Sequence, residues 1–166
     1  MALVFCAFLY FSIMFPWFGK SKSLLSKDIQ DAVVSAIAAN ERKSRGEMRV
    51  YVESHCNMVN PIDRCEQIFV QLKMHETKER NGVLLYLAIK DRQFAIVGDE
   101  GINQKVGGNE YWNYIATKLK EYFGAGKMKE GICYCIEEIG QSLANHYPDN
   151  GTENINELPD EIVFGK

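Results

Sequence analysis

The feature that most constrains the fold is an uninterrupted apolar run in the middle of the chain, Val83–Ile89. A strand that is buried on both faces has this pattern, because neither set of its alternating side chains meets water. The polar stretch 90–93 that follows is typical of a turn, and residues 94–97 predict a short strand that returns as a hairpin. Since such a strand must be covered from both sides, the run predicts an α/β fold.

The residues before this run predict a strand followed by a helix. Residues 47–53 alternate between apolar and polar side chains, which indicates a strand with one apolar face. Asn60 and Pro61 are typical of a helix start, with Asn as the cap and Pro in the first turn. A strand, a helix and a second strand in succession predict a parallel pair with a right-handed crossover.

Three further helices follow from the spacing of apolar residues. They are predicted over 27–45, from Asn109 to the Gly124-Ala125-Gly126 break, and from Lys127 to about His146. The glycine-rich stretch 98–108 predicts a loop, or a loop with one helical turn. The sequence therefore predicts a small mixed β-sheet with helices on both faces, an α/β sandwich of Rossmann-like character.

Composition restricts the class of protein. Apolar residues make up 46% of the chain and charged residues 25%, which are values of a globular protein. The net charge of −3 gives no general attraction to nucleic acid, so no nucleic-acid partner is expected. Five cysteines at irregular spacing do not predict a disulfide framework, and we expect all five thiols to be free in a reduced compartment.

The chain divides into an apolar N-terminal segment, 1–23, a domain over 24–147, and an acidic C-terminal tail, 148–166. No charge occurs from Ala2 to Phe18, and 17 helical residues reach roughly 25 Å, the lower limit for crossing a bilayer. A membrane anchor would leave the domain cytoplasmic, because the first lysines, Lys20 and Lys22, flank the apolar run on its C-terminal side. The tail begins with turn residues, and we expect it to be solvated or docked through Ile162, Val163 and Phe164.

Two alternatives to the anchor remain for the N-terminal segment. If the start is over-extended and Met14 is the true first residue, the protein is soluble and cytoplasmic. A cleaved signal peptide is the third interpretation, although the segment lacks a basic start and ends in the bulky residues 15–18.

Polar residues cluster where the predicted strands begin and end. Asn81 leads into the central strand, and Asp99 and Glu100 follow the hairpin. If the hairpin forms, its open ends meet, and these three side chains supply oxygen ligands for a hard cation, Ca²⁺ or Mg²⁺. The remaining members of this predicted cluster are Glu47, Arg49, Arg80 and Asp91. The alternative is a capped loop with solvated acids.

Other motifs do not predict a catalytic centre. Seven residues lie between Cys56 and Arg64 rather than the five of cysteine phosphatases, and Pro61 removes an N–H donor from the loop between them. Cys133 and Cys135 do not have the spacing of a zinc pair. The spacing of Asp99 and Glu110 matches a calcium loop, but Gln104 stands where that loop needs glycine.

Several stretches resemble the TPM domain family, whose members include a thylakoid lumen protein of photosystem II repair and a nematode receptor-accessory protein. They are residues 78–92 (KERNGVLLYLAIKDR) and 94–102 (FAIVGDEGI), with 46–50 (GEMRV) in support. Residues 156–161 (NELPDE) resemble a bacterial subgroup. The resemblance covers about residues 24–147 and implies a small α/β sandwich.

The resemblance also implies a choice between two functions. One is an ion-binding or protein-interaction module that supports membrane-protein assembly or repair, with a membrane protein as partner. The alternative is a metal-assisted hydrolase of small phosphomonoesters, in which Asp99 and Glu100 hold the cation that polarises the phosphate. We favour the first, because no activated nucleophile or general base can be named from the sequence.

Overall fold

The computed structural model describes residues 4–5, 24–149, 151 and 161–165, and its centre is a five-stranded mixed sheet in the order β1-β4-β3-β2-β5. The strands are β1 (Val4–Phe5), β2 (Glu47–Glu53), β3 (Gly82–Ala88), β4 (Gln93–Gly98) and β5 (Val163–Phe164). The helices are α1 (Lys27–Glu41), α2 (Pro61–Gln71), α3 (Glu100–Lys105), α4 (Asn109–Gly124) and α5 (Met128–His146), with a 3-10 turn η1 (Met74–Glu76).

The central strands pair as the sequence predicts. β2 and β3 are parallel, with Glu47 opposite Gly82, and α2 forms the crossover between them. β4 returns antiparallel to β3, with Val83 opposite Gly98. Every residue of β3 is buried, which confirms that the apolar run is a strand covered on both faces.

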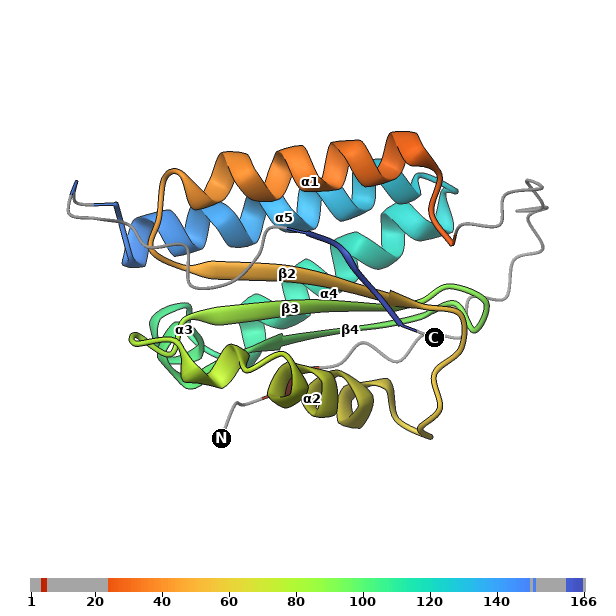
Figure 1. The fold of residues 1–166 in the computed structure, drawn as a ribbon, viewed down its shortest axis with the longest axis horizontal. Helices are drawn as coiled ribbons and strands as arrows, with labels where there is room; N and C mark the ends of the chain where they lie inside the picture. Colours follow the sequence, from red (N-terminus) through yellow and green to blue (C-terminus); the bar gives the residue numbers. More distant parts are fainter. Residues whose placement is uncertain (1–3, 6–23, 150, 152–160, 166) are drawn as a thin grey trace.

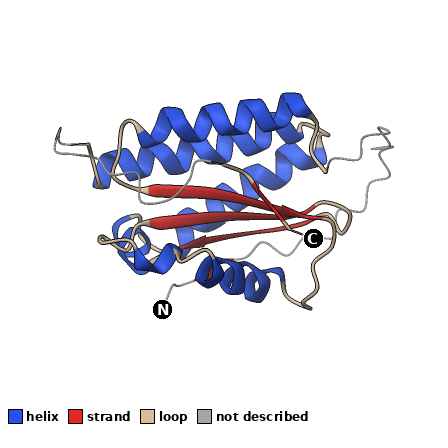
Figure 2. Cartoon of the chain, viewed as in Figure 1, coloured by secondary structure: helices blue, strands red, loops and turns tan. Residues whose placement is uncertain are grey.

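Helices cover both faces of the sheet (Figures 1 and 2). On one face, α1, α4 and α5 pack on the apolar side of β2 and on alternate residues of β3 and β4. On the other face, α2 and η1 pack on the remaining side chains of β3 and β4, including Leu84, Tyr86 and Val97. The mixed α/β sandwich predicted from the sequence is therefore confirmed.

The ends of two helices differ from the prediction. α1 ends at Glu41 rather than near Arg45, and Gly46 lies against α5 instead of ending the helix. A Cβ at Gly46 would stand 2.5 Å from Leu143, so this glycine is required by packing. α4 is capped by Gly108 at φ +70° rather than by Asn109, because a backbone in the left-handed region favours glycine.

The polar side of β2 is buried as well as its apolar side. Glu47, Arg49 and Glu53 are 4%, 8% and 2% exposed, respectively. β5 pairs parallel to β2, with Val163 opposite Tyr51, and Ile162 packs against the core. Of the two expectations for the tail, solvated or docked, its described residues show docking through β5 and Ile162, while Phe164 is 45% exposed.

The interpretations of the N-terminal segment fall mostly outside the described residues. The exception is β1, which pairs antiparallel with β4, Val4 opposite Val97. Among the described residues, none of the helices has the length and apolar character needed to cross a membrane. Cys56, Cys133 and Cys135 are free thiols, as expected, and Cys6 lies outside the described residues.

Candidate functional site

The starts of β2 and β3 and the end of β4 lie together at one edge of the sheet, the edge formed by strand ends rather than by an outer strand. The hairpin closes there through a hydrogen bond of 2.9 Å from the backbone N–H of Asp99 to the carbonyl of Gly82. Asn81 and Asp99 therefore flank the same pair of strand ends, as the sequence predicts from the hairpin.

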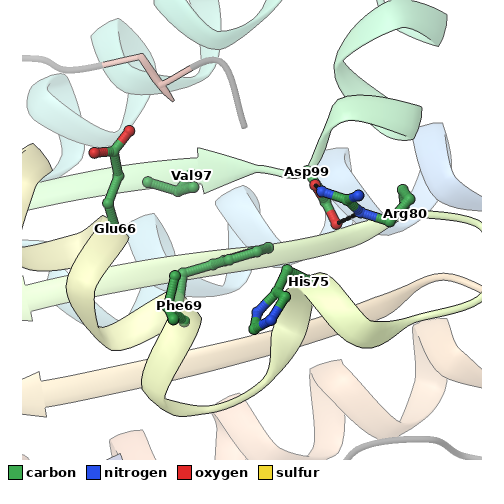
Figure 3. Close-up of a pocket in the computed structure, with 7 residues that line it drawn as sticks. Glu66, Phe69, His75, Arg80, Val97 and Asp99 are labelled. Atoms are coloured by element: carbon green, nitrogen blue, oxygen red, sulfur yellow. Dashed lines mark hydrogen bonds and ion pairs between the residues drawn. The ribbon is translucent and has the colours of Figure 1, made fainter. Parts of the chain in front are cut away.

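Asp99 is fully buried and is held by Arg80. Arg80 donates from Nε to Oδ2 of Asp99 over 2.7 Å and from Nη2 to Oδ1 over 2.8 Å (Figure 3). Oδ1 also accepts from the backbone N–H of Glu100 at the start of α3, over 2.8 Å. The hydrogen bonds and charge of Asp99 raise the pKa of Arg80. The Arg80 side chain is nevertheless 41% exposed, so one partner of the pair is buried and the other reaches solvent.

Two loops cross at this pair. The carbonyl of Arg80 accepts from the backbone N–H groups of Gly101, over 2.9 Å, and Ile102, over 3.3 Å. A Cβ at Gly101 would stand 2.3 Å from the carbonyl oxygen of Glu79, so only glycine allows the loop before β3 to lie this close to α3. The φ of Gly101 is not positive, so glycine is required here by this close approach rather than by a left-handed backbone.

Asn81 faces the loop before β2 rather than Asp99. Its Nδ2 donates to the carbonyl of Arg45 over 2.9 Å. Its Oδ1 is buried and has no hydrogen-bond partner among the described residues. Glu100, the third predicted ligand, is exposed, and its Oε1 accepts from Gln104 over 3.2 Å. The three predicted ligands thus share one edge of the sheet, while their side chains point to different neighbours.

The other members of the predicted cluster separate into two places. Glu47 and Arg49 lie side by side on the buried polar side of β2, where burial lowers the pKa of Arg49 and the charge of Glu47 opposes that shift. Asp91 lies in the turn between β3 and β4, at the opposite edge of the sheet. Including Asp91 in the cluster was wrong. The turn lies at one end of the hairpin, and the two strand ends that carry Asn81 and Asp99 meet at the other.

Asp91 instead organises the loop after β2. Its Oδ1 contacts Nδ1 of His55 over 2.7 Å, and its Oδ2 accepts from the backbone N–H of Cys56 over 2.6 Å. The carboxylate therefore ties the β3–β4 turn to the loop that leads into α2.

A second buried carboxylate at this opposite edge was missed by the sequence analysis. Glu53 accepts from Nε and Nη2 of Arg64, over 2.9 and 2.8 Å, and from the hydroxyl of Tyr86 over 2.5 Å. Arg64, considered in the sequence only as a phosphate ligand after Cys56, is committed to Glu53. The sequence did carry a signal for this ion pair: an acid ends the strand, and a base lies in the first turn of the crossover helix that follows.

A small pocket of ≈ 190 Å³ adjoins the Arg80–Asp99 pair on the α2 side of β4 (Figure 3). Phe69 and Val70 of α2 and Val97 of β4 are its apolar lining residues. Glu66, His75, Arg80 and Asp99 complete it. Within the described part of the chain, no group of three or more His, Cys, Asp or Glu side chains is arranged to hold a metal ion. Because Arg80 donates to both carboxylate oxygens of Asp99, a cation at Asp99 must compete with Arg80.

Comparisons with known proteins agree with this fold. The family model of the TPM domain matches residues 20–142. The NMR structure of the BA42 protein from the psychrophilic bacterium Bizionia argentinensis is similar, with 35% identity and a TM-score of 0.78. The similarity covers 87% of this chain and 97% of that one. A comparison with curated proteins found no match.

Proposed function

Because the chain belongs to the TPM domain family, we propose that it is an ion-binding module that holds Ca²⁺ or Mg²⁺ where the loop before β3 crosses α3. The observation that carries the proposal is the Arg80–Asp99 pair, in which a fully buried carboxylate is neutralised by a side chain that is 41% exposed. A buried carboxylate needs a cationic or hydrogen-bonding partner whenever it is ionised. The partner here belongs to a loop and can move into solvent.

Binding is an exchange of one cation for another. When the guanidinium of Arg80 turns outward, both oxygens of Asp99 become available to a hard cation, which prefers oxygen ligands. Glu100 follows in the chain and brings a second, exposed carboxylate. The buried Oδ1 of Asn81 is an amide oxygen at the same edge, with no hydrogen-bond partner among the described residues.

The proposed consequence of binding is a change in the loops that a partner contacts. The cation replaces an internal ion pair that fastens the loop before β3 to α3, so the two loops respond to the concentration of the cation. We propose a membrane protein as the partner, with a role in its assembly or repair.

Calorimetric titration and thermal unfolding in Ca²⁺ and Mg²⁺ test this function. The melting temperature of the wild type is expected to rise as the cation concentration passes its Kd, because the ion binds only the folded state. Asp99→Asn, which can still accept a hydrogen bond from Arg80, should lose that rise, and Glu100→Gln should reduce it. Asp31→Asn, which removes an exposed carboxylate on α1, should keep it. A wild type that shows neither heat of binding nor a shift contradicts the proposal.

The alternative is a metal-assisted phosphomonoester hydrolase at the same place. The observation that favours it is the pocket beside Asp99, whose lining includes Arg80 and His75, side chains that bind phosphate oxygens when charged. Hydrolysis of p-nitrophenyl phosphate by the cation-loaded protein, compared with the cation alone, tests it. Loss of the rate in His75→Gln with cation binding retained would support the hydrolase, and equal rates with and without protein would exclude it.

A further inference from the structure

The outer edge of β4 and the flank of α2 form a groove that already holds an extended segment. β1 lies on this edge, where it pairs antiparallel with β4 at Val97 and Ile96, and it lies against both α2 and α4. An open strand edge presents backbone N–H and C=O groups that any extended chain can pair with. The groove therefore accepts a strand through its backbone.

The pocket continues this groove. Val97 both pairs with β1 and lines the pocket, so strand and pocket share one wall. Phe69 and Val70 form its other apolar lining, and Val70 is 52% exposed. The charged groups lie at its two ends: Glu66 at one, and Arg80 paired with Asp99 at the other (Figure 3). This lining suits an uncharged apolar side chain.

β1 belongs to a stretch of sequence of this kind. The sequence around β1, from Ala2 to Phe18, carries no charge. Among the described residues of this stretch, Val4 and Phe5 form a two-residue strand that pairs with β4. So short an edge strand makes few backbone hydrogen bonds, and a second segment of similar composition can compete for the same edge.

We propose that the groove between α2 and the outer edge of β4 is a docking site for an extended, uncharged, apolar segment of a partner protein. The segment adds to β4 as an antiparallel strand in place of β1 and inserts a side chain into the pocket lined by Phe69, Val70 and Val97. This site goes beyond the ion-binding role, and the cation titration above is unaffected if it fails.

The test measures binding of a labelled peptide to the full chain by fluorescence anisotropy. The peptide copies residues 2–8, with serine in place of Cys6 and lysines appended for solubility. The double variant Val4→Pro, Phe5→Pro removes backbone donors from β1 and opens the groove. We expect it to bind the peptide about tenfold more tightly than the wild type does, because the internal competitor is weakened.

Two matched substitutions locate the binding. In the double-variant background, Val70→Glu should weaken peptide binding about tenfold, since it places a charge at the apolar pocket. Val34→Glu introduces the same charge at another exposed helix position, on α1, and should leave binding unchanged. NMR shifts on peptide addition should centre on Ala95–Val97.

Three results would overturn the proposal. One is the absence of peptide binding to the double variant. Another is an equal effect of Val70→Glu and Val34→Glu. The third is equal binding of a control peptide with a central lysine, which would show non-specific adhesion rather than a strand site.

Discussion

Two buried carboxylates, one at each edge of the sheet, are each held by two nitrogens of an arginine, and the two pairs differ in how their arginines are fixed. Arg64 lies inside α2, is 12% exposed, and also donates from Nη1 to Gln67 over 2.6 Å. Arg80 lies in a loop at φ +52° and is 41% exposed. The same chemical contact is thus part of a regular helix at one edge and of a solvent-exposed loop at the other.

The two carboxylates also differ in how firmly their surroundings hold them. Burial acts to raise the pKa of Glu53, and hydrogen bonds from Arg64 and Tyr86 outweigh it, so the pKa lies below its ordinary value. Asp99 takes its third hydrogen bond from the backbone of α3 rather than from a buried side chain. We infer that Glu53–Arg64 is a structural cross-link between β2 and α2, and that Asp99–Arg80 is an exchangeable contact.

The largest expected effect comes from breaking the cross-link. Arg64→Gln leaves the Glu53 carboxylate buried with Tyr86 as its remaining side-chain partner. Removal of one member of a buried pair costs about 3–5 kcal/mol in the free energy of unfolding. Urea denaturation measures the loss, and neither Ca²⁺ nor Mg²⁺ should restore it. A stability equal to that of the wild type would show that this pair is not the cross-link we describe.

The matched change at the other edge should cost less and be reversible. Arg80→Gln is expected to lower the free energy of unfolding by about 1–3 kcal/mol, because solvent can reach the vacated place beside Asp99. Removal of the competing guanidinium should also tighten cation binding, so Ca²⁺ restores the melting temperature. If Arg64→Gln and Arg80→Gln respond alike to the cation, the distinction between the pairs is wrong.

Removal of the third hydrogen bond to Glu53 gives a smaller effect. Tyr86→Phe deletes one hydrogen bond and leaves the bidentate contact with Arg64 in place. The expected loss is about 1–1.5 kcal/mol, measured by urea denaturation with an unchanged m-value. A loss as large as that of Arg64→Gln would mean that the hydroxyl, not the guanidinium, dominates the cross-link.

The pH dependence of stability gives the smallest change. Since folding lowers the pKa of Glu53, its contribution is present above the unfolded pKa of about 4.3 and is lost as pH falls through the folded pKa. The difference in melting temperature between the wild type and Arg64→Gln should therefore shrink as pH falls below this value, by about 2–4 °C for each 1 kcal/mol lost. The prediction is contradicted if the difference in melting temperature stays constant down to the lowest pH at which both proteins fold.

Local patterns predicted the central strands because burial on one or both faces leaves a periodic trace in the sequence. Val83–Ile89 and residues 47–53 carry such traces, and Asn60-Pro61 marks the helix between them. The outer strands β1 and β5 could not be predicted, since two paired residues have no period and form where an edge happens to be open. Only the docking of the tail could be expected, from its apolar residues.

The candidate site was predicted in position but not in contacts. Hairpin geometry brings Asn81 and Asp99 to one edge, and it also places Asp91 at the other, which the prediction overlooked. The pairing of Arg80 with Asp99 depends on the left-handed φ of Arg80 and on the close approach of its loop to Gly101, neither of which has a local signal.

The sequence by itself determined the layered α/β sandwich, because apolar periodicity specifies which face of each strand and helix is buried. Only the tertiary structure decided which carboxylate each arginine holds. Glu53 and Arg64 are separated by 11 positions and Arg80 and Asp99 by 19, so their contacts arise when the elements that carry them are packed. In the unfolded chain each guanidinium can meet several carboxylates. In the folded protein the packed backbone holds one carboxylate within hydrogen-bond distance of each of these two arginines.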